Sequence, residues 1–168
     1  MKKMYSDMNN SDVQRLMGLI EARDLETVLG WVHACSEKYI LPACGEENSA
    51  LVKEMICLLD HPDLSKQGKE KIKAVIREVR TAAAKEKNPA VQAALRAVST
   101  GAAVITTPSS ALGFVLYGVM AYAYSVCDPA AETAVIRKAE EALKDFADLL
   151  EKTPQAEEGR ALRVKWNC

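Results

Sequence analysis

The residues best suited to hold a metal ion are His33, Cys35 and Cys44, which lie close together in the chain. Imidazole nitrogen and thiolate sulfur are common zinc ligands. On a helix, however, side chains two positions apart point in different directions, so His33 and Cys35 are poorly placed to share one ion. The other histidine, His61, stands beside Pro62 at an expected helix end. We therefore predict no metal site and no cofactor, with His33 partly exposed and Cys35 packed in the core.

Nucleophilic catalysis requires a serine or cysteine that is activated by a neighbouring base. The two histidines and several serines permit such a pair on paper, but the sequence contains no GxSxG elbow, no HExxH pattern and no glycine-rich phosphate loop. Four carboxylates of the last predicted helix have the spacing of a solvated helix face: Glu140, Glu141, Asp145 and Asp148. We predict no catalytic residues and a protein that is not an enzyme.

A row of basic residues is the strongest binding signal in the chain. Its members are spaced by four, four and three positions and so share one helix face: Lys69, Lys73, Arg77 and Arg80. Such a row suits an acidic protein surface or phosphates. Glutamates on adjacent faces dilute its positive field, and no aromatic residue interleaves with it, which disfavours single-stranded nucleic acid. We take these four residues as the candidate partner-binding surface, and a purely solvated face remains the alternative.

A second candidate anion site is the hydroxyl-rich turn Thr106-Thr107-Pro108-Ser109-Ser110. It precedes an expected helix, whose free backbone N–H groups attract anions. Helix capping explains the same residues equally well.

Helical spacing of apolar residues recurs along nearly the whole chain and predicts about seven helices. The expected ranges are 11–20, 25–40, 48–59, 64–87, 89–105, 108–127 and 129–150. The expected N-caps are Ser11, Asp24, Asn48 or Ser49, Asn88, Thr107 and Asp128, the last three of which each precede a proline. No segment alternates with a period of two, so we predict no strands.

The stretch between Arg96 and Asp128 contains no charged residue. A membrane span needs about 20 apolar residues in one helix, whereas the turn at residues 106–110 interrupts this stretch. A buried hairpin at the centre of a bundle explains the pattern better. Gly101 and Gly118 would let helices approach closely, and Tyr117 and Tyr124 would bond to the backbone.

These elements predict an all-α, single-domain helical bundle of about seven helices around a buried apolar hairpin. The bundle is expected over residues 11–153, after a flexible N-terminal segment at 1–10 and before a polar tail at 154–168, whose Trp166 is a candidate to dock on the bundle. Hydrophobic residues make up 49% and charged residues 27% of the 168 residues, the mixture of a globular protein rather than a disordered one.

The charge balance and the cysteines bear on the location of the protein. The formal net charge is −1, so the sequence demands neither a polyanion nor a membrane surface as partner. The odd number of cysteines and the lack of a CxxC pair indicate buried thiols in a reducing compartment, with Cys168 free on the tail. The first ten residues lack the apolar stretch of a secretion signal. We expect a cytoplasmic protein that does not enter the membrane.

Three stretches resemble a family of predicted all-helical bacterial immunity proteins from polymorphic toxin systems, of the alanine-rich hairpin class. Residues 29–37, LGWVHACSE, with Leu41-Pro42 after them, look like the tryptophan helix of that family. Residues 77–85, REVRTAAAK, are similar to its arginine–alanine helix. Residues 90–124, AVQAALRAVSTGAAVITTPSSALGFVLYGVMAYAY, resemble its hairpin, although this chain has threonine and serine at the turn where the family pattern has histidines.

The resemblance implies a protein that neutralises a toxin by covering it, with no chemistry of its own. The expected partner is thus a protein, with a cognate toxin as the candidate. Two alternatives stay open. One is a nucleic-acid-associated helical protein that uses the basic row, and the other is a small-ligand-binding bundle with a polar pocket around His33, Tyr117 and Tyr124.

Overall fold

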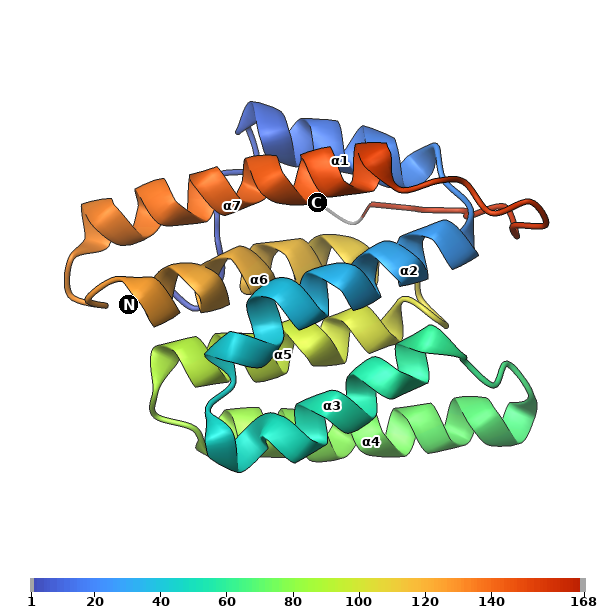
Figure 1. Ribbon diagram of the computed structural model, residues 1–168, viewed down its shortest axis with the longest axis horizontal. Helices are drawn as coiled ribbons and strands as arrows, with labels where there is room; N and C mark the ends of the chain where they lie inside the picture. Colours follow the sequence, from blue (N-terminus) through green and yellow to red (C-terminus); the bar gives the residue numbers. More distant parts are fainter. Residues whose placement is uncertain (1, 167–168) are drawn as a thin grey trace.

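Helices dominate the computed structural model, which describes residues 2–166 (Figure 1). Within this range the only pairing of extended backbone is one isolated antiparallel bridge between Asp24 and Ala161. The predicted all-α, single-domain bundle of seven helices is confirmed. The α-helices of the described range are α1 (Ser11–Glu21), α2 (Leu25–Cys35), α3 (Glu46–Asp60), α4 (Lys66–Lys85), α5 (Pro89–Ala103), α6 (Ser110–Val126) and α7 (Glu132–Lys152).

The helices are arranged around the α5–α6 hairpin. In Figure 1, α1 and α7 lie along one edge of the molecule and α3 and α4 along the other, with α2, α5 and α6 between them. Within the hairpin α5 packs on α6; beyond it, α5 packs on α4 and α6 packs on α7. The α5–α6 hairpin thus has neighbours on both sides.

Most residues of α5 and α6 are buried. This confirms that the uncharged stretch is the interior of the bundle. In residues 2–166, no helix combines the length and the apolar character that crossing a membrane would require.

Two glycines of the hairpin stand where helices cross at close range, as predicted. A Cβ atom added to Gly101 would lie 2.8 Å from Cγ1 of Val32 and 3.0 Å from Cδ2 of Phe114. A Cβ atom added to Gly118 would lie 3.2 Å from Cε2 of Phe146. These distances are shorter than ordinary carbon contacts, so a larger residue at Gly101 requires a neighbour to move.

The second predicted helix, residues 25–40, is not one unbroken α-helix. It changes from α-helix to a π-helical turn, η1 (Ser36–Ile40), and then to a 3₁₀ turn, η2 (Leu41–Ala43). The buried side chains of this segment recur every four residues, as Trp31, Val32, Cys35, Ser36, Tyr39 and Ile40. An α-helix has 3.6 residues per turn and would rotate such a stripe away from the core. The wider π turn keeps these side chains facing inward.

The predicted N-caps Asp24 and Asn88 are confirmed. The Asp24 carboxylate accepts the N–H of Thr27 at 2.7 Å, and the Asn88 side chain accepts the N–H of Ala90 at 3.0 Å. Both residues stand in extended backbone directly before their helices, as a cap requires.

The other predicted N-caps are wrong. The side chain that caps α1 is Asn10 rather than Ser11, and α3 begins at Glu46, before Asn48, because Gly45 with φ of 72° turns the chain there. At α6 the backbone carbonyl of Thr107, not its hydroxyl, accepts the N–H of Ser110. Asp128 forms a turn before α7 by accepting the N–H of Ala130 at 2.9 Å.

Both end segments contact the bundle. Tyr5 is buried, its N–H donates to the Leu116 carbonyl at 3.0 Å, and its hydroxyl donates to Glu140 at 3.1 Å. Burial and the Glu140 carboxylate raise the pKa of Tyr5 to about 12. In the tail, the Arg160 carbonyl accepts the N–H of Leu25, and Trp166 packs against the core as expected.

The four cysteines of the described range are free thiols. Cys35 and Cys44 are buried as predicted, and Cys127 is half-buried. Cys57 is exposed, which corrects the expectation that it would be buried. Cys168 lies outside the described residues.

The packing at Gly101 predicts the effect of one added methyl group. Gly101→Ala should lower the free energy of unfolding by about 1–3 kcal/mol, because the methyl overlaps Val32 and Phe114. Gly30→Ala on α2 is the matched control, since no atom lies within 4 Å of its added Cβ and alanine favours a helix by up to about 1 kcal/mol. Urea unfolding measures both. An equal loss in the two variants, or a larger loss in Gly30→Ala, would contradict the close crossing.

The cap at Asp24 predicts a loss of stability at low pH. Burial opposes ionisation of Asp24, but hydrogen bonds from Thr27 outweigh it and hold the pKa of this carboxyl below its ordinary value of 3.8. Its contribution is therefore full above about pH 5 and is lost as the pH falls through the lower pKa of the folded state. Asp24→Ala should lower the free energy of unfolding by about 1–2 kcal/mol at pH 7. In a plot of this free energy against pH, the variant should show a shallower fall at acid pH than the native protein. Asp128→Ala, at an exposed turn, should leave that fall unchanged.

Candidate functional site

The candidate metal ligands do not converge. Nδ1 of half-buried His33 lies 3.8 Å from the carboxylate of Glu37, whereas Cys35 is fully buried and its burial raises the pKa of its thiol. His61 is 92% exposed at the end of α3. In residues 2–166 no three His, Cys, Asp or Glu side chains are grouped to hold a metal ion. The predicted environments of His33 and Cys35 are confirmed.

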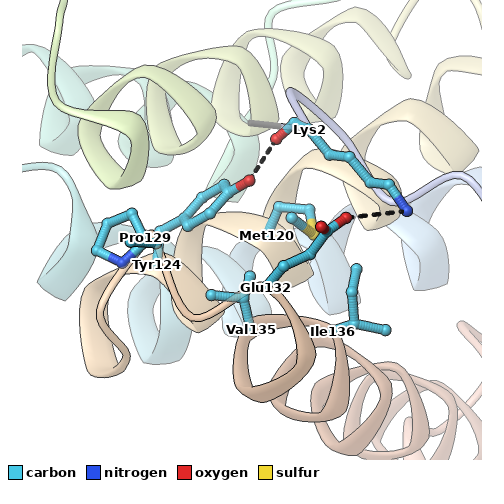
Figure 2. A pocket seen from close by; sticks show the side chains of 8 residues that line it. Lys2, Met120, Tyr124, Pro129, Glu132, Val135 and Ile136 are labelled. Carbon is cyan, nitrogen blue, oxygen red and sulfur yellow. Dashed lines mark hydrogen bonds and ion pairs between the residues drawn. The ribbon is translucent and has the colours of Figure 1, made fainter.

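The pocket expected around His33, Tyr117 and Tyr124 does not form as one site. Tyr124 lines a hollow of about 430 Å³ between the end of α6 and the start of α7, and Tyr117 lines a different one. In Figure 2, the Tyr124 hydroxyl donates to the carbonyl of Lys2 at 2.6 Å, while Nζ of Lys2 lies 3.8 Å from Glu132. The bond from Tyr124 to the backbone confirms its predicted role. The charged groups of this hollow are paired with each other, and its other walls are largely apolar.

The basic row lies on α4, which begins after Ser65 accepts the N–H of Gly68 at 3.0 Å. The opposite face of α4 is buried against the bundle through Ile72, Val75, Ile76, Val79 and Ala83. This amphipathic pattern leaves Lys73, Arg77 and Arg80 exposed and Lys69 half-buried. The row therefore stands on the outer face of α4.

The structure brings the basic row and the hydroxyl-rich turn together. A groove of about 370 Å³ lies between α4 and the start of α6. Its polar lining, which we call the basic groove, consists of Glu70, Lys73, Arg77, Arg80, Thr106, Thr107 and Ser110. Lys69 is absent from this lining. The two anion candidates found separately in the sequence are thus two walls of one groove.

The charges of the basic groove are only partly compensated. Nζ of Lys73 lies 2.8 Å from the Glu70 carboxylate. Among residues 2–166, no carboxylate oxygen lies within 4 Å of a guanidinium nitrogen of Arg77 or Arg80. The groove therefore presents net positive charge beside hydroxyl groups, a combination that suits an anionic group.

A second hollow, of about 270 Å³, adjoins the basic groove because Arg80 lines both. We call it the Arg96 notch, and its walls are Arg80, Ala83, Arg96, Ser99, Thr100 and Tyr117. The Arg96 guanidinium carbon lies 5.8 Å from the centre of the Tyr117 ring. In the sequence, Arg96 marked only the boundary of the uncharged stretch. The missed signal was its isolation, since no other charged residue occurs between Pro89 and Val126.

A comparison with known protein families shows the family of this chain. Residues 18–148, more than half of the sequence, match the family described as Imm-5 like putative immunity protein. The chain belongs to this family. The matched range includes all of α4 and the α5–α6 hairpin, and thus both the basic groove and the Arg96 notch. No curated protein and no solved structure matches the chain.

The exposed position of the basic row predicts that its charges are dispensable for folding. A variant with Gln at Lys69, Lys73, Arg77 and Arg80 should change the free energy of unfolding by less than about 1 kcal/mol, because surface charges contribute little. Val79→Ala, on the buried face of the same helix, should cost about 1–3 kcal/mol. Urea unfolding compares the two. A large loss in the four-residue variant would mean that the row supports the fold.

Proposed function

We propose that this protein is a toxin-neutralising immunity protein that acts by stoichiometric binding. It covers a cognate toxin and performs no reaction itself. Membership of the immunity family, over residues 18–148, is the observation that carries the proposal.

The basic groove supports a binding role. Its cations stand on a helix whose opposite face is fixed in the core, so they are presented on a rigid support. Rigid presentation lowers the entropy cost of association. A typical stable interface buries about 800 Å² on each partner, and the basic groove and Arg96 notch together would form part of such a surface. The partner that this surface fits is a protein with an acidic face.

The proposed place of action is the cytoplasm, where the toxin would be met in the producing or neighbouring cell. Free thiols at Cys35, Cys44, Cys57 and Cys127 are compatible with a reducing compartment.

The direct test is co-expression with the toxin domain encoded beside the gene of this protein. We expect a complex that survives size-exclusion chromatography and protection of the cells that express it. Titration of toxin activity should end at a fixed molar ratio, as a stoichiometric inhibitor requires. The proposal fails if the neighbouring toxin domain yields neither a complex nor protection, and a substoichiometric end point would indicate catalysis instead.

The contact surface is tested by two variants of equal charge. One replaces the basic row, Lys69, Lys73, Arg77 and Arg80, with Gln. The other replaces two lysines and two arginines elsewhere, Arg137, Lys144, Lys152 and Arg163, all exposed or half-exposed on α7 and the tail. We expect at least about tenfold weaker toxin binding for the first variant and little change for the second, since charges at a contact act locally. Equal losses would assign the effect to net charge.

The same proteins also test the nucleic-acid alternative. Retention on immobilised DNA or RNA that weakens steeply with salt, and that the first variant abolishes, would favour that alternative.

A further inference from the structure

We propose that the Arg96 notch is a carboxylate-binding site that receives one aspartate or glutamate side chain of the protein partner. The inference rests on the proposed function for the nature of the partner. It adds a recognition residue on α5, outside the basic row, and assigns its ligand a chemical class.

The Arg96 side chain is held in place before any ligand arrives. It projects from α5, whose other side chains are mostly buried, and its guanidinium lies over the Tyr117 ring at 5.8 Å. A guanidinium on an aromatic face is attracted by the electron-rich ring. Because the rotamers of Arg96 are already restricted, little further entropy is lost when the guanidinium binds an anion.

The hydrogen-bonding capacity of Arg96 is not met by the protein. Its Nε atom is covered from solvent and has no hydrogen-bond acceptor among residues 2–166. The hydroxyls of Ser99 and Thr100, which line the same notch, donate to the backbone carbonyl of Arg96 at 2.9 Å. These bonds engage both hydroxyls with the backbone, so the guanidinium groups of Arg80 and Arg96 are the charged donors of the notch. A buried donor without an acceptor is rare in proteins, so Arg96 keeps a hydrogen-bonding capacity that the described residues do not use.

The charge of the notch is also uncompensated. Arg80 and Arg96 line one hollow of about 270 Å³, and across the described part of the chain neither forms an ion pair with a carboxylate. The nearby Glu70 is engaged by Lys73. Two guanidinium groups at one site raise the potential there and favour an anion. A carboxylate accepts two parallel N–H bonds from one guanidinium, so its shape matches the donors available.

A protein carboxylate fits the notch better than a nucleic acid does. The only aromatic ring in the notch, Tyr117, faces Arg96, which competes with a base for stacking on it. The chain has a net charge of −1 and carries exposed glutamates on α7, so it lacks the extended positive field that holds a polyanion. In Figure 1, α7 lies along the edge of the bundle opposite α4, so the acidic and basic helices are well separated.

A titration with a synthetic hexaglutamate peptide tests the notch without the toxin. In the ¹⁵N-labelled protein at low salt, the Nε–Hε resonance of Arg96, assigned by its absence from Arg96→Lys, should shift on addition of the peptide. Arg96→Gln should weaken peptide binding by at least about tenfold, the loss expected for one charge-assisted pair. Arg137→Gln removes an exposed arginine from α7 and should bind the peptide as the native protein does. An unshifted Arg96 resonance, or equal affinities of the Gln variants, would overturn the assignment.

The variants also separate failure of the notch from failure of the proposed function. If Arg96→Gln does not fold, Arg80→Gln provides a second test, because it changes an exposed side chain. We expect this variant to bind the hexaglutamate peptide about tenfold more weakly. A toxin complex whose affinity is unchanged in Arg96→Lys and Arg80→Gln would reject the notch and keep the function. Peptide binding at Arg96 without any toxin complex would reject the function and keep the notch. Tighter binding of a thymidine oligonucleotide than of hexaglutamate, lost in Arg96→Gln, would replace the carboxylate with a nucleic-acid phosphate.

Discussion

The fold depends on the close packing of the α5–α6 hairpin against Trp31. The indole ring contacts Phe114 and Phe146 edge to face, with ring centres 5.7 Å and 6.2 Å away, and its N–H donates to the carbonyl of Phe146 at 3.0 Å. This bond satisfies the one polar atom of a side chain that is otherwise surrounded by hydrocarbon. The absence of a side chain at Gly101 allows Val32, beside Trp31, to reach the hairpin. The centre of the bundle is thereby filled with apolar side chains.

The position of the hairpin determines what the surface can bind. Because α5 packs against α4, the turn that follows α5 brings its hydroxyl groups to the outer face of α4, beside Arg77 and Arg80. The same packing places Arg96 of α5 beside Arg80. Within the described residues Arg96 forms no ion pair with a carboxylate. The cations that we assign to recognition thus come from two helices and are held by one core. The family membership supports a protein partner, and we propose from the charges of this surface that the partner face is acidic.

Local sequence signals predicted most of the fold because they act over a few residues. Asn88 followed by Pro89 starts α5 as expected, since a cap and a fixed φ need no tertiary contact. The spacing of the basic row likewise follows from helix geometry alone. By contrast, Thr107 does not act as a side-chain cap, because the turn before α6 closes through backbone bonds. The π turn at Ser36–Ile40 was also missed, since it depends on which side chains the core accepts.

Only part of the candidate site could be predicted from the sequence, because local signals do not show how helices pack together. Residues of one helix, such as Arg77 and Arg80, can be placed on one face from their spacing. The meeting of that face with Thr106 and Ser110 depends on how α4 packs against the hairpin, which no local pattern encodes. Arg96 stood out as a lone charge in an apolar stretch, but only its neighbours in space give it a role.

The central claim is that the surface formed by α4 and the α5–α6 turn meets the toxin. Hydrogen exchange of the purified complex, read by mass spectrometry against the free protein, tests it most directly. We expect slower exchange in residues 66–85 and 104–110 when the toxin domain is bound, with little change in residues 132–152. Slower exchange confined to residues 132–152 would place the interface on α7 and rule out the surface formed by α4 and the α5–α6 turn.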